Sequence, residues 1–287
     1  MKYGAETASK NIQEKIEDVL SQMGVMYRIF GRVKDETSLL KKLDSDERYG
    51  VTKRLQDFIG IRIVLYFSDD INVVHYALSS IFSEREKDQS IDDMNDRTFM
   101  PIRYNLIYDI PSEIGYEIPL KFEGKVDLTF ELQIRTVLSE GWHEVEHDLR
   151  YKCHDDWSDF PNESRKLNGV YASLETNEWT MIKIFDEIAY GHYKSRNWEA
   201  MLRQKLRLRL TDHNLDQEIS DILSNFPEVA KKFYRLDRAL LMRCLNEHGY
   251  GYPVNLNNMV YFSNLFYVGN EEILKITPEP IKDYLND

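Results

Sequence analysis

Two side chains of opposite charge, Asp57 and Arg62, lie near the start of a largely apolar segment at residues 56–70, QDFIGIRIVLYFSDD. Asp57 precedes a turn-permitting glycine, Gly60, and the apolar, β-branched run at residues 61–67 is typical of a central strand buried on both faces. Arg62 lies inside that run, and a buried strand carries a charge only when an opposite charge compensates it. The residues therefore indicate either a site for a metal-bound phosphate or a structural ion pair between Asp57 and Arg62.

A second candidate site follows a strand predicted at residues 25–33. Arg32 and Lys34 lead from this strand towards a helix predicted from Ser38 to about residue 44, with Thr37 or Ser38 as its N-cap. Lys41 and Lys42 lie near the end of that helix. Basic residues beside a helix start form a ready anion site. The alternative is a pair of charges on an exposed turn.

Residues 125–136, KVDLTFELQIRT, alternate between apolar and polar side chains. The side chains of one strand alternate between the two faces of a sheet, so the polar set shares one face. That face is expected to line a cleft, with Glu131, Gln133 and Arg135 along one wall. A solvent-facing edge strand is the alternative.

The helix predicted at residues 137–151 contains the pattern H-E-x-x-H between His143 and His147. Two histidines four residues apart on a helix can hold zinc while the glutamate between them polarises water. Glu163, Glu175 and Glu178 are candidate third ligands, although none has a distinctive context. A zinc metallohydrolase is therefore one alternative function.

Strands are predicted near residues 25, 61, 103 and 126, with helices between them, and the polar segment 83–98 is expected to be a loop. From residue 162 the pattern is helical: a helix at 167–190 is interrupted at Gly191, a helix resumes at 198–210, and further helices occupy 216–245 and 257–266. We predict an α+β fold, with a mixed sheet flanked by helices in residues 1–158 and an all-helical extension in residues 159–287.

The 287-residue chain carries a formal net charge of −12, so its overall field repels nucleic acid. The densest basic cluster of the chain consists of Arg203, Lys205, Arg207 and Arg209. It is either a patch that binds RNA phosphates or a regulatory anion, or it is the solvated face of a helix. Cys153 and Cys244 fit a reducing compartment. No apolar stretch is long enough for a membrane span, and we expect a cytoplasmic protein.

Four blocks, taken in order, resemble the synthetase domain of the RelA/SpoT family, the nucleotide pyrophosphokinases that include the small alarmone synthetases. They are GRVKDETSLLKKL at 31–43, LQDFIGIRIVLYFSDDI at 55–71, ELQIRT at 131–136, and W-x-x-x-E-H-x-x-x-Y-K from Trp142 to Lys152. The resemblance implies a nucleotidyltransferase-like sheet of about five strands. The family shares Glu146 and His147 but not His143, which makes the H-E-x-x-H pattern accidental.

The resemblance implies that a pyrophosphoryl group passes from ATP to a ribose 3′-hydroxyl, with Mg²⁺ as cofactor and AMP as the second product. On the donor side it implies ATP phosphates held by Arg32, Lys34, Ser38, Lys41 and Lys42. Asp57 and Glu131 are the implied metal ligands, and Glu131 is also a candidate base. Arg62 would neutralise the transferred group, and Gln133, Arg135 and His147 would support the acceptor.

The chain departs from the family where other members carry a Tyr-x-Ser-x-His block. Pro101 stands at the tyrosine position and Asn105 at the histidine position. Arg103 is a candidate for the acceptor phosphate, and Tyr104 is a candidate for base stacking from a shifted place. GDP or GTP is the default acceptor, while an adenine nucleotide or the 3′ end of tRNA is the alternative.

The family admits both stress signalling and growth-arresting toxins, and the altered acceptor block also admits a catalytically silent nucleotide sensor. The C-terminal half is expected to pack on the core, to mediate homo-oligomerisation or to sense a signal.

Overall fold

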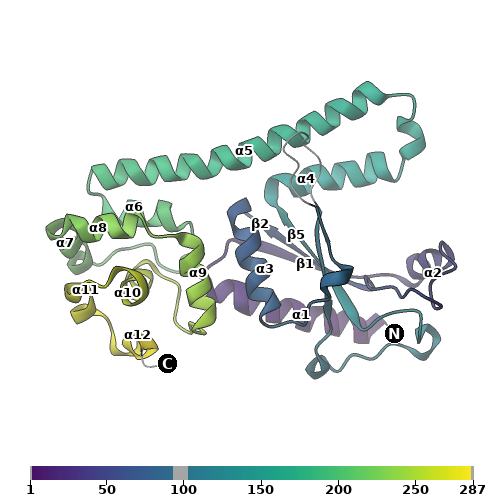
Figure 1. Ribbon diagram of the computed structural model, residues 1–287, viewed down its shortest axis with the longest axis horizontal. Coiled ribbons are helices and arrows are strands. Elements are labelled where there is room, and N and C mark those ends of the chain that lie inside the picture. Colours follow the sequence, from purple (N-terminus) through teal and green to yellow (C-terminus); the bar gives the residue numbers. More distant parts are fainter. Residues whose placement is uncertain (1, 93–102, 286–287) are drawn as a thin grey trace. The chain divides into compact units, whose positions relative to one another are not determined.

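The computed structural model describes residues 2–92 and 103–285 (Figure 1). By its contacts the chain divides into two compact units, which are described separately below. The first unit comprises Met1–Asp18 and Tyr27–Glu178, and the second comprises Val19–Met26 and Trp179–Asp287.

A five-stranded sheet forms the centre of the first unit, in the order β1-β2-β5-β4-β3. Its strands are β1 (Tyr27–Val33), β2 (Ile59–Leu65), β3 (Ser90–Ile91), β4 (Tyr104–Asp109) and β5 (Thr129–Thr136). Strands β2 and β5 are parallel, and the other neighbours are antiparallel. The predicted mixed sheet of about five strands is confirmed. The short strand β3 lies within the segment that we expected to be a loop throughout.

One face of the sheet is apolar and packs against helices α1 (Lys2–Gln22) and α3 (Ile71–Ser79). A Cβ added to Gly31 of β1 would collide with Gln13 of α1, so strand and helix approach closely there. Ser79 of α3 hydrogen-bonds the hydroxyl of Tyr108 on β4 at 2.9 Å. This face is the core, and Phe130, Leu132 and Ile134 of β5 are almost fully buried in it.

Strand β5 lies between β2 and β4, so its polar side chains do not belong to an edge strand. The edge-strand interpretation of residues 125–136 is therefore wrong. Alternation instead turns Glu131, Gln133 and Arg135 to the face opposite α1 and α3. Gly60 also lies inside a strand, β2, rather than in a turn.

The first unit also contains α2 (Glu36–Asp44), α4 (Val137–Glu146) and the first part of α5 (Pro161–Lys194). Asp35 caps α2 by accepting a 2.9 Å hydrogen bond from the backbone N–H of Ser38, so the predicted Thr37 or Ser38 cap is wrong. Thr136 caps α4 and forms a capping box with Ser139. A π-helical turn, His147–Tyr151, continues α4.

The described part of the second unit is helical, as predicted. Its helices are the remainder of α5, α6 (Trp198–Leu206), α7 (Gln217–Asn225), α8 (Pro227–Tyr234), α9 (Arg238–Glu247), α10 (Leu256–Ser263), α11 (Glu271–Ile276) and α12 (Glu279–Lys282). The continuous helix predicted at 216–245 is three helices, because Pro227 starts α8 and Asp237 caps α9. The predicted interruption at Gly191 is also wrong, since α5 continues to Lys194.

Most side chains of the basic cluster in the second unit are paired with acidic side chains or buried. Arg203 pairs with Glu199 at 2.7 Å, Lys205 pairs with Asp186 at 3.3 Å, and Arg207 is buried. Cations that are paired or buried offer little to RNA phosphates, so this arrangement favours a structural role. Among the described residues, no helix combines the length and the hydropathy that crossing a bilayer requires.

Candidate active site

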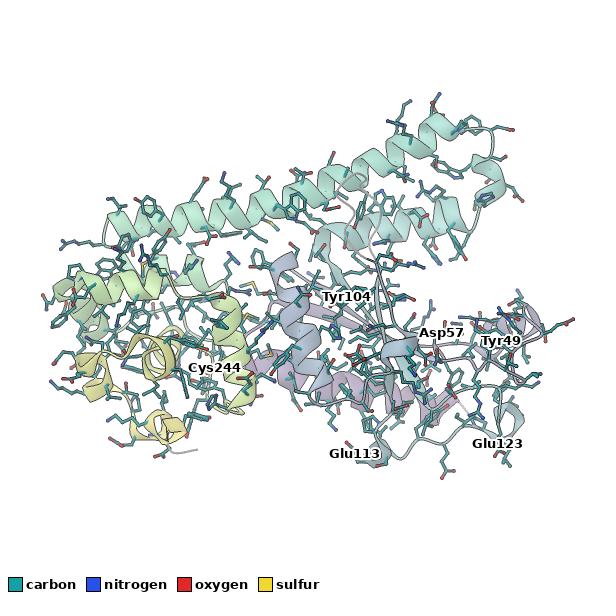
Figure 2. The ribbon with its side chains drawn as sticks, viewed as in Figure 1. Tyr49, Asp57, Tyr104, Glu113, Glu123 and Cys244 are labelled. Atoms are coloured by element: carbon teal, nitrogen blue, oxygen red, sulfur yellow. The ribbon has the colours of Figure 1, made fainter. Side chains whose placement is uncertain are left out.

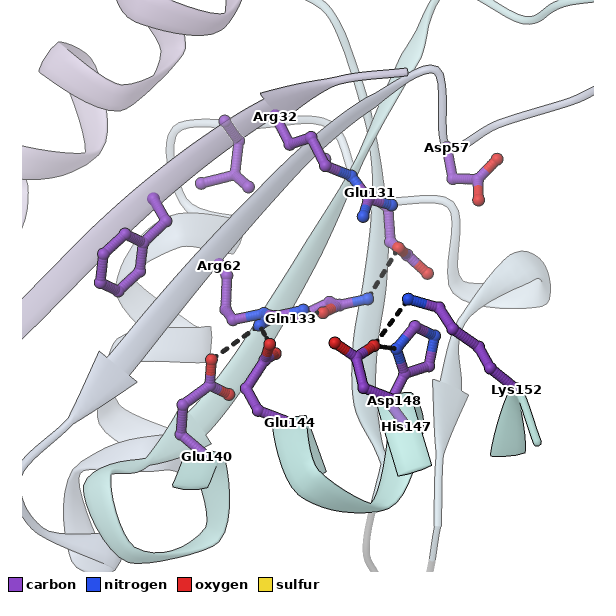
Figure 3. A pocket seen from close by; sticks show the side chains of 13 residues that line it. Arg32, Asp57, Arg62, Glu131, Gln133, Glu140, Glu144, His147, Asp148 and Lys152 are labelled. Carbon is purple, nitrogen blue, oxygen red and sulfur yellow. Dashed lines mark hydrogen bonds and ion pairs between the residues drawn. The ribbon is translucent and has the colours of Figure 1, made fainter. Parts of the chain in front are cut away.

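The polar face of the sheet carries a cavity of about 530 Å³ (Figure 3). Two rows of residues across the strands form its floor: Phe30, Arg62 and Gln133 are in register, and so are Arg32, Gly60 and Glu131. Glycine at position 60 leaves the floor open between the arginine and the glutamate on either side. A cavity of this volume is large enough for a nucleotide-sized ligand.

Asp57, just before β2, is an acid at the cavity that pairs with two lysines. Its Oδ2 accepts hydrogen bonds from Nζ of Lys34 at 2.7 Å and Nζ of Lys42 at 2.6 Å. Burial disfavours the charged carboxylate, but the two ammonium groups outweigh it and hold the pKa of Asp57 below its usual value. Its other oxygen, Oδ1, is buried and has no partner within residues 2–92 and 103–285.

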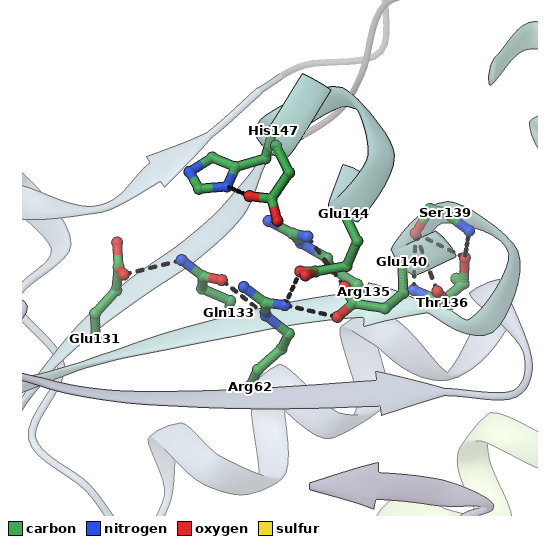
Figure 4. Close-up of polar contacts among 10 residues, drawn as sticks. Arg62, Glu131, Gln133, Arg135, Thr136, Ser139, Glu140, Glu144 and His147 are labelled. Atoms are coloured by element: carbon green, nitrogen blue, oxygen red, sulfur yellow. Dashed lines mark hydrogen bonds and ion pairs between the residues drawn. The ribbon is translucent and has the colours of Figure 1, made fainter. Parts of the chain in front are cut away.

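Arg62 does not pair with Asp57, so the structural ion pair considered from the sequence is wrong. Its Nη1 instead donates to Glu140 at 2.7 Å and to Glu144, both on α4 (Figure 4). Nε donates to Gln133 Oε1 at 3.1 Å. Arginine has five donors, and the two on Nη2 have no partner in the described parts of the chain.

Sequence reasoning missed Glu140 and Glu144 as neighbours of this site. The available signal was their spacing, because acids four residues apart lie on one face of a helix. That helix begins directly after the strand with Glu131, Gln133 and Arg135. Phe30, Asp148 and Lys152 also line the cavity and were not predicted for it.

Glu131 is held in place by two amides. Gln133 Nε2 donates to Oε2 at 3.0 Å, and Asn105 Nδ2 of β4 donates to Oε1 at 3.3 Å. Burial raises the pKa of Glu131, and the negative charge of Asp57 raises it further. Two acids at one cavity therefore have pKa values shifted in opposite directions.

The predicted donor-side cations are partly brought together. Arg32 lines the cavity, is exposed, and has no partner among the described residues. Lys34 and Lys42 are not lining residues themselves, but both pair with Asp57, which lines the cavity. Ser38 instead donates its hydroxyl proton to Asp35 at 2.6 Å, and neither Ser38 nor Lys41 is among the lining residues.

Four predicted acceptor residues line a second cavity of about 290 Å³: Arg103, Asn105, Arg135 and His147. His147 lines both cavities. Tyr104 is not part of this set, because alternation along β4 turns it to the core face, where its hydroxyl lies 2.8 Å from His75 Nδ1. Pro101 lies outside the described residues.

The environment of His143 does not favour zinc. Burial, followed by the charges of Arg135 and Arg62, lowers the pKa of His143 to about 4, and those guanidinium groups would also repel a cation. The described residues bring together no three His, Cys, Asp or Glu side chains that could hold a metal. Glu178, one of the candidate third ligands, hydrogen-bonds Thr136 instead.

The polar face of the mixed sheet thus brings Asp57 and Glu131 to one cavity with Arg32 and Arg62. Residues 31–156 match the family model described as "Region found in RelA / SpoT proteins". Over 133 residues the chain is 29% identical to GTP pyrophosphokinase YjbM of Bacillus subtilis. That match covers 43% of this chain and 56% of the relative's length.

Solved structures with a similar chain trace include small alarmone synthetase 1 of Bacillus subtilis, with 22% identity and a TM-score of 0.45 over 65% of this chain and 94% of that one. Another is smu.1046c of Streptococcus mutans, with 25% identity and a TM-score of 0.46 over 64% of this chain and 94% of that one. The similarity to RelA/SpoT proteins thus extends over residues 31–156 of this chain.

Proposed function

We propose that this chain transfers a pyrophosphoryl group from ATP to the 3′-hydroxyl of a nucleotide, with Mg²⁺ as cofactor and AMP as the second product. The carrying observation is the pair of acids with opposite pKa shifts at one cavity. Asp57 is kept ionised by two lysines, while Glu131 is made more basic by burial and by Asp57. When the surroundings of two acids shift their pKa values in opposite directions, one acid can stay ionised and bind a cation while the other transfers a proton.

The donor half of the proposal rests on cations with unused donors. Each lysine ammonium has three N–H donors, so Lys34 and Lys42 can contact phosphate oxygens while they hold Asp57. Arg32 and the Nη2 group of Arg62 face the same cavity with no other partner in the described chain. Phosphoryl chemistry of this kind depends mainly on positioning and charge neutralisation.

The residues present fit a divalent cation. Asp57 Oδ1 is a buried carboxylate oxygen with no partner among the described residues, and Glu131 is close enough for its pKa to feel the charge of Asp57. Asp57 and Glu131 would hold Mg²⁺, which prefers carboxylate and phosphate oxygens. When bound, the ion supplies positive charge against the phosphates of the donor.

Glu131 is proposed to accept the proton of the attacking 3′-hydroxyl. Burial and the charge of Asp57 bring the pKa of Glu131 closer to neutral pH, where a general base works best, and this role applies when Asp57 carries the metal ion. Hydrogen bonds from Gln133 and Asn105 fix both of its oxygens, so the orientation of the carboxylate is set before the substrate binds.

A guanine nucleotide, GDP or GTP, is the proposed acceptor, supported by the name of the curated relative. A panel of GDP, GTP, ADP, ATP and tRNA, each incubated with labelled ATP and Mg²⁺, tests this choice. We expect AMP and a modified nucleotide with GDP or GTP. AMP with a modified tRNA 3′ end or adenine nucleotide would instead assign the chain to the toxin-type alternative.

The enzyme proposal fails if no member of the panel yields AMP. Calorimetric binding of the same nucleotides then separates two outcomes. Binding without turnover would identify a nucleotide sensor, and absence of binding would remove the nucleotide assignment altogether.

A further inference from the structure

His143 is a half-buried side chain that the proposed reaction does not use, although it lines the second cavity beside Arg103, Arg135 and Glu146. Its ring packs edge-on against Trp142 and Tyr171, with ring centroids 5.4 Å and 6.0 Å away. These contacts fix the ring plane without using its polar atoms. Within residues 2–92 and 103–285, neither ring nitrogen has a hydrogen-bond partner.

The charge state of His143 limits what it can recognise. With its pKa lowered to about 4, the imidazole is neutral at physiological pH. A neutral imidazole has one donor and one acceptor, which suits the polar edge of a nucleobase. Phosphate groups in this cavity are better matched by Arg103 and Arg135, which pair with Asp92 and Glu140 but keep N–H donors that have no partner among the described residues.

An aromatic surface lies at the same cavity. Tyr151 is 71% exposed over the whole residue and, like His143, is not used by the proposed reaction. Its ring is nearly parallel to that of His147, with centroids 5.7 Å apart and an interplanar angle of 13°. One face of Tyr151 is therefore backed by His147, and unstacked nucleobases commonly pack on exposed aromatic rings.

We propose that His143 is a specificity-determining residue that hydrogen-bonds the base edge of the acceptor nucleotide, while the base packs against Tyr151. The ligand class is a purine nucleoside di- or triphosphate, bound with its phosphates towards Arg103 and Arg135. This inference rests on the proposed function, since it assigns the acceptor of that same reaction to the second cavity.

His143→Phe and His143→Gln test the inference together. Phenylalanine keeps the aromatic packing on Trp142 and Tyr171 but removes both ring nitrogens, whereas glutamine keeps one donor group and one acceptor. The matched control is His154→Gln, because the side chain of His154 is 85% exposed and lines neither cavity. Melting temperatures of all four proteins establish that each is folded.

For the acceptor that the wild type uses best, kcat/KM is expected to fall about 10- to 100-fold in His143→Phe, the range of one or two lost hydrogen bonds. The KM for ATP should stay within about twofold of wild type, because Arg32, Lys34 and Lys42 are untouched. His143→Gln should recover part of the loss, and the preference between guanine and adenine acceptors should narrow in His143→Phe.

Equal acceptor kinetics in wild type and His143→Phe would overturn the inference and leave the proposed reaction standing. If the wild type forms no AMP, the proposed function fails separately, and the Kd values of GDP and ADP decide about His143. A Kd unchanged by His143→Phe, or no binding by the wild type, overturns the inference in that case as well.

Discussion

The surroundings of Asp57 stabilise its negative charge, whereas those of Glu131 destabilise it. Lys34 and Lys42 stabilise the ionised form of Asp57, so the folded state gains stability as pH rises from the lowered pKa of Asp57 to the ordinary carboxyl value, and keeps that stability at higher pH. Burial opposes the ionised form of Glu131, so its ionisation costs folding free energy above that range. The two acids therefore contribute to stability with opposite signs at neutral pH.

Two matched substitutions test this difference. At pH 7 we expect Asp57→Asn to lower the melting temperature, because two lysines lose their counter-charge, whereas Glu131→Gln should keep or raise it. Both should reduce AMP formation by at least about 100-fold, the usual contribution of a positioned acid–base group. Thermal unfolding at pH 3, pH 5 and pH 7 provides the measurement.

The pH dependence supplies the internal control. In the wild type Asp57 loses its stabilising charge only as the pH falls below the ordinary carboxyl value of 3.8 towards its lowered pKa, so the gap between wild type and Asp57→Asn should stay nearly constant from pH 7 to pH 5 and narrow below about pH 4. A Glu131→Gln variant clearly less stable than wild type at pH 7 would contradict the assigned pKa shift.

The sequence was informative about these residues because strand alternation is a strong constraint. Glu131, Gln133 and Arg135 could be placed on one polar face from their period-two spacing alone. The partner of Arg62 could not be found in this way, because Glu140 and Glu144 belong to another element. Likewise Tyr104 was assigned to the acceptor, although its strand parity opposes that of Asn105.

Helix α4 links the two cavities, because Glu140 and Glu144 contact Arg62 while His143, Glu146 and His147 line the second cavity. Thr136 holds the start of this helix as its N-cap. Its hydroxyl also contacts the buried carboxyl group of Glu178 on α5, whose pKa is raised by burial. The position of α4 therefore depends on a small buried network.

Thr136→Ala is expected to lower the free energy of unfolding by about 1 kcal/mol through the lost cap, and by more if Glu178 is left unpaired. AMP formation should fall while the KM for ATP changes little, because Arg32, Lys34 and Lys42 are not on α4. Chemical denaturation and steady-state kinetics give both quantities.

Ser173→Ala on α5 is the matched control, because it also removes a helix hydroxyl but from an exposed position. It should leave both stability and kinetics unchanged. A Thr136→Ala protein with wild-type stability would argue against the capping network.

Among the secondary-structure elements, long segments with a clear hydrophobic period could be predicted from the sequence. Helix caps, very short strands and the effect of a single glycine could not. The Asp35 cap was missed because a carboxylate before a helix competes with Thr37 and Ser38, which are equally good caps. Strand β3 has only two residues, too few for alternation to show. Gly191 does not break α5, because a glycine weakens a helix without removing its hydrogen bonds.

Across the whole molecule the net charge is −12, and the cavity of the proposed site is lined by acids as well as by Arg32, Arg62 and Lys152. In the second unit, Arg203 and Lys205 of the basic cluster pair with acids, and Arg207 is buried with its Nη1 3.9 Å from Asp186. The sequence shows that cluster clearly but not its partners, since Asp186 lies on a different helix.

Arg207→Glu is expected to destabilise the fold by about 3–5 kcal/mol, because it buries a negative charge beside Asp186. Arg209→Glu, an exposed reversal two residues away, is the control and should cost far less. If the cluster instead served RNA, both reversals would weaken tRNA binding and reduce its salt dependence equally, without loss of stability.

The fate of the β-phosphate of ATP tests the central claim most directly. With β-labelled ATP, Mg²⁺ and the best acceptor, the wild type should release unlabelled AMP and place the label in the acceptor, whereas Glu131→Gln should do neither. Label recovered in ADP, or in free pyrophosphate with an unmodified acceptor, would contradict pyrophosphoryl transfer.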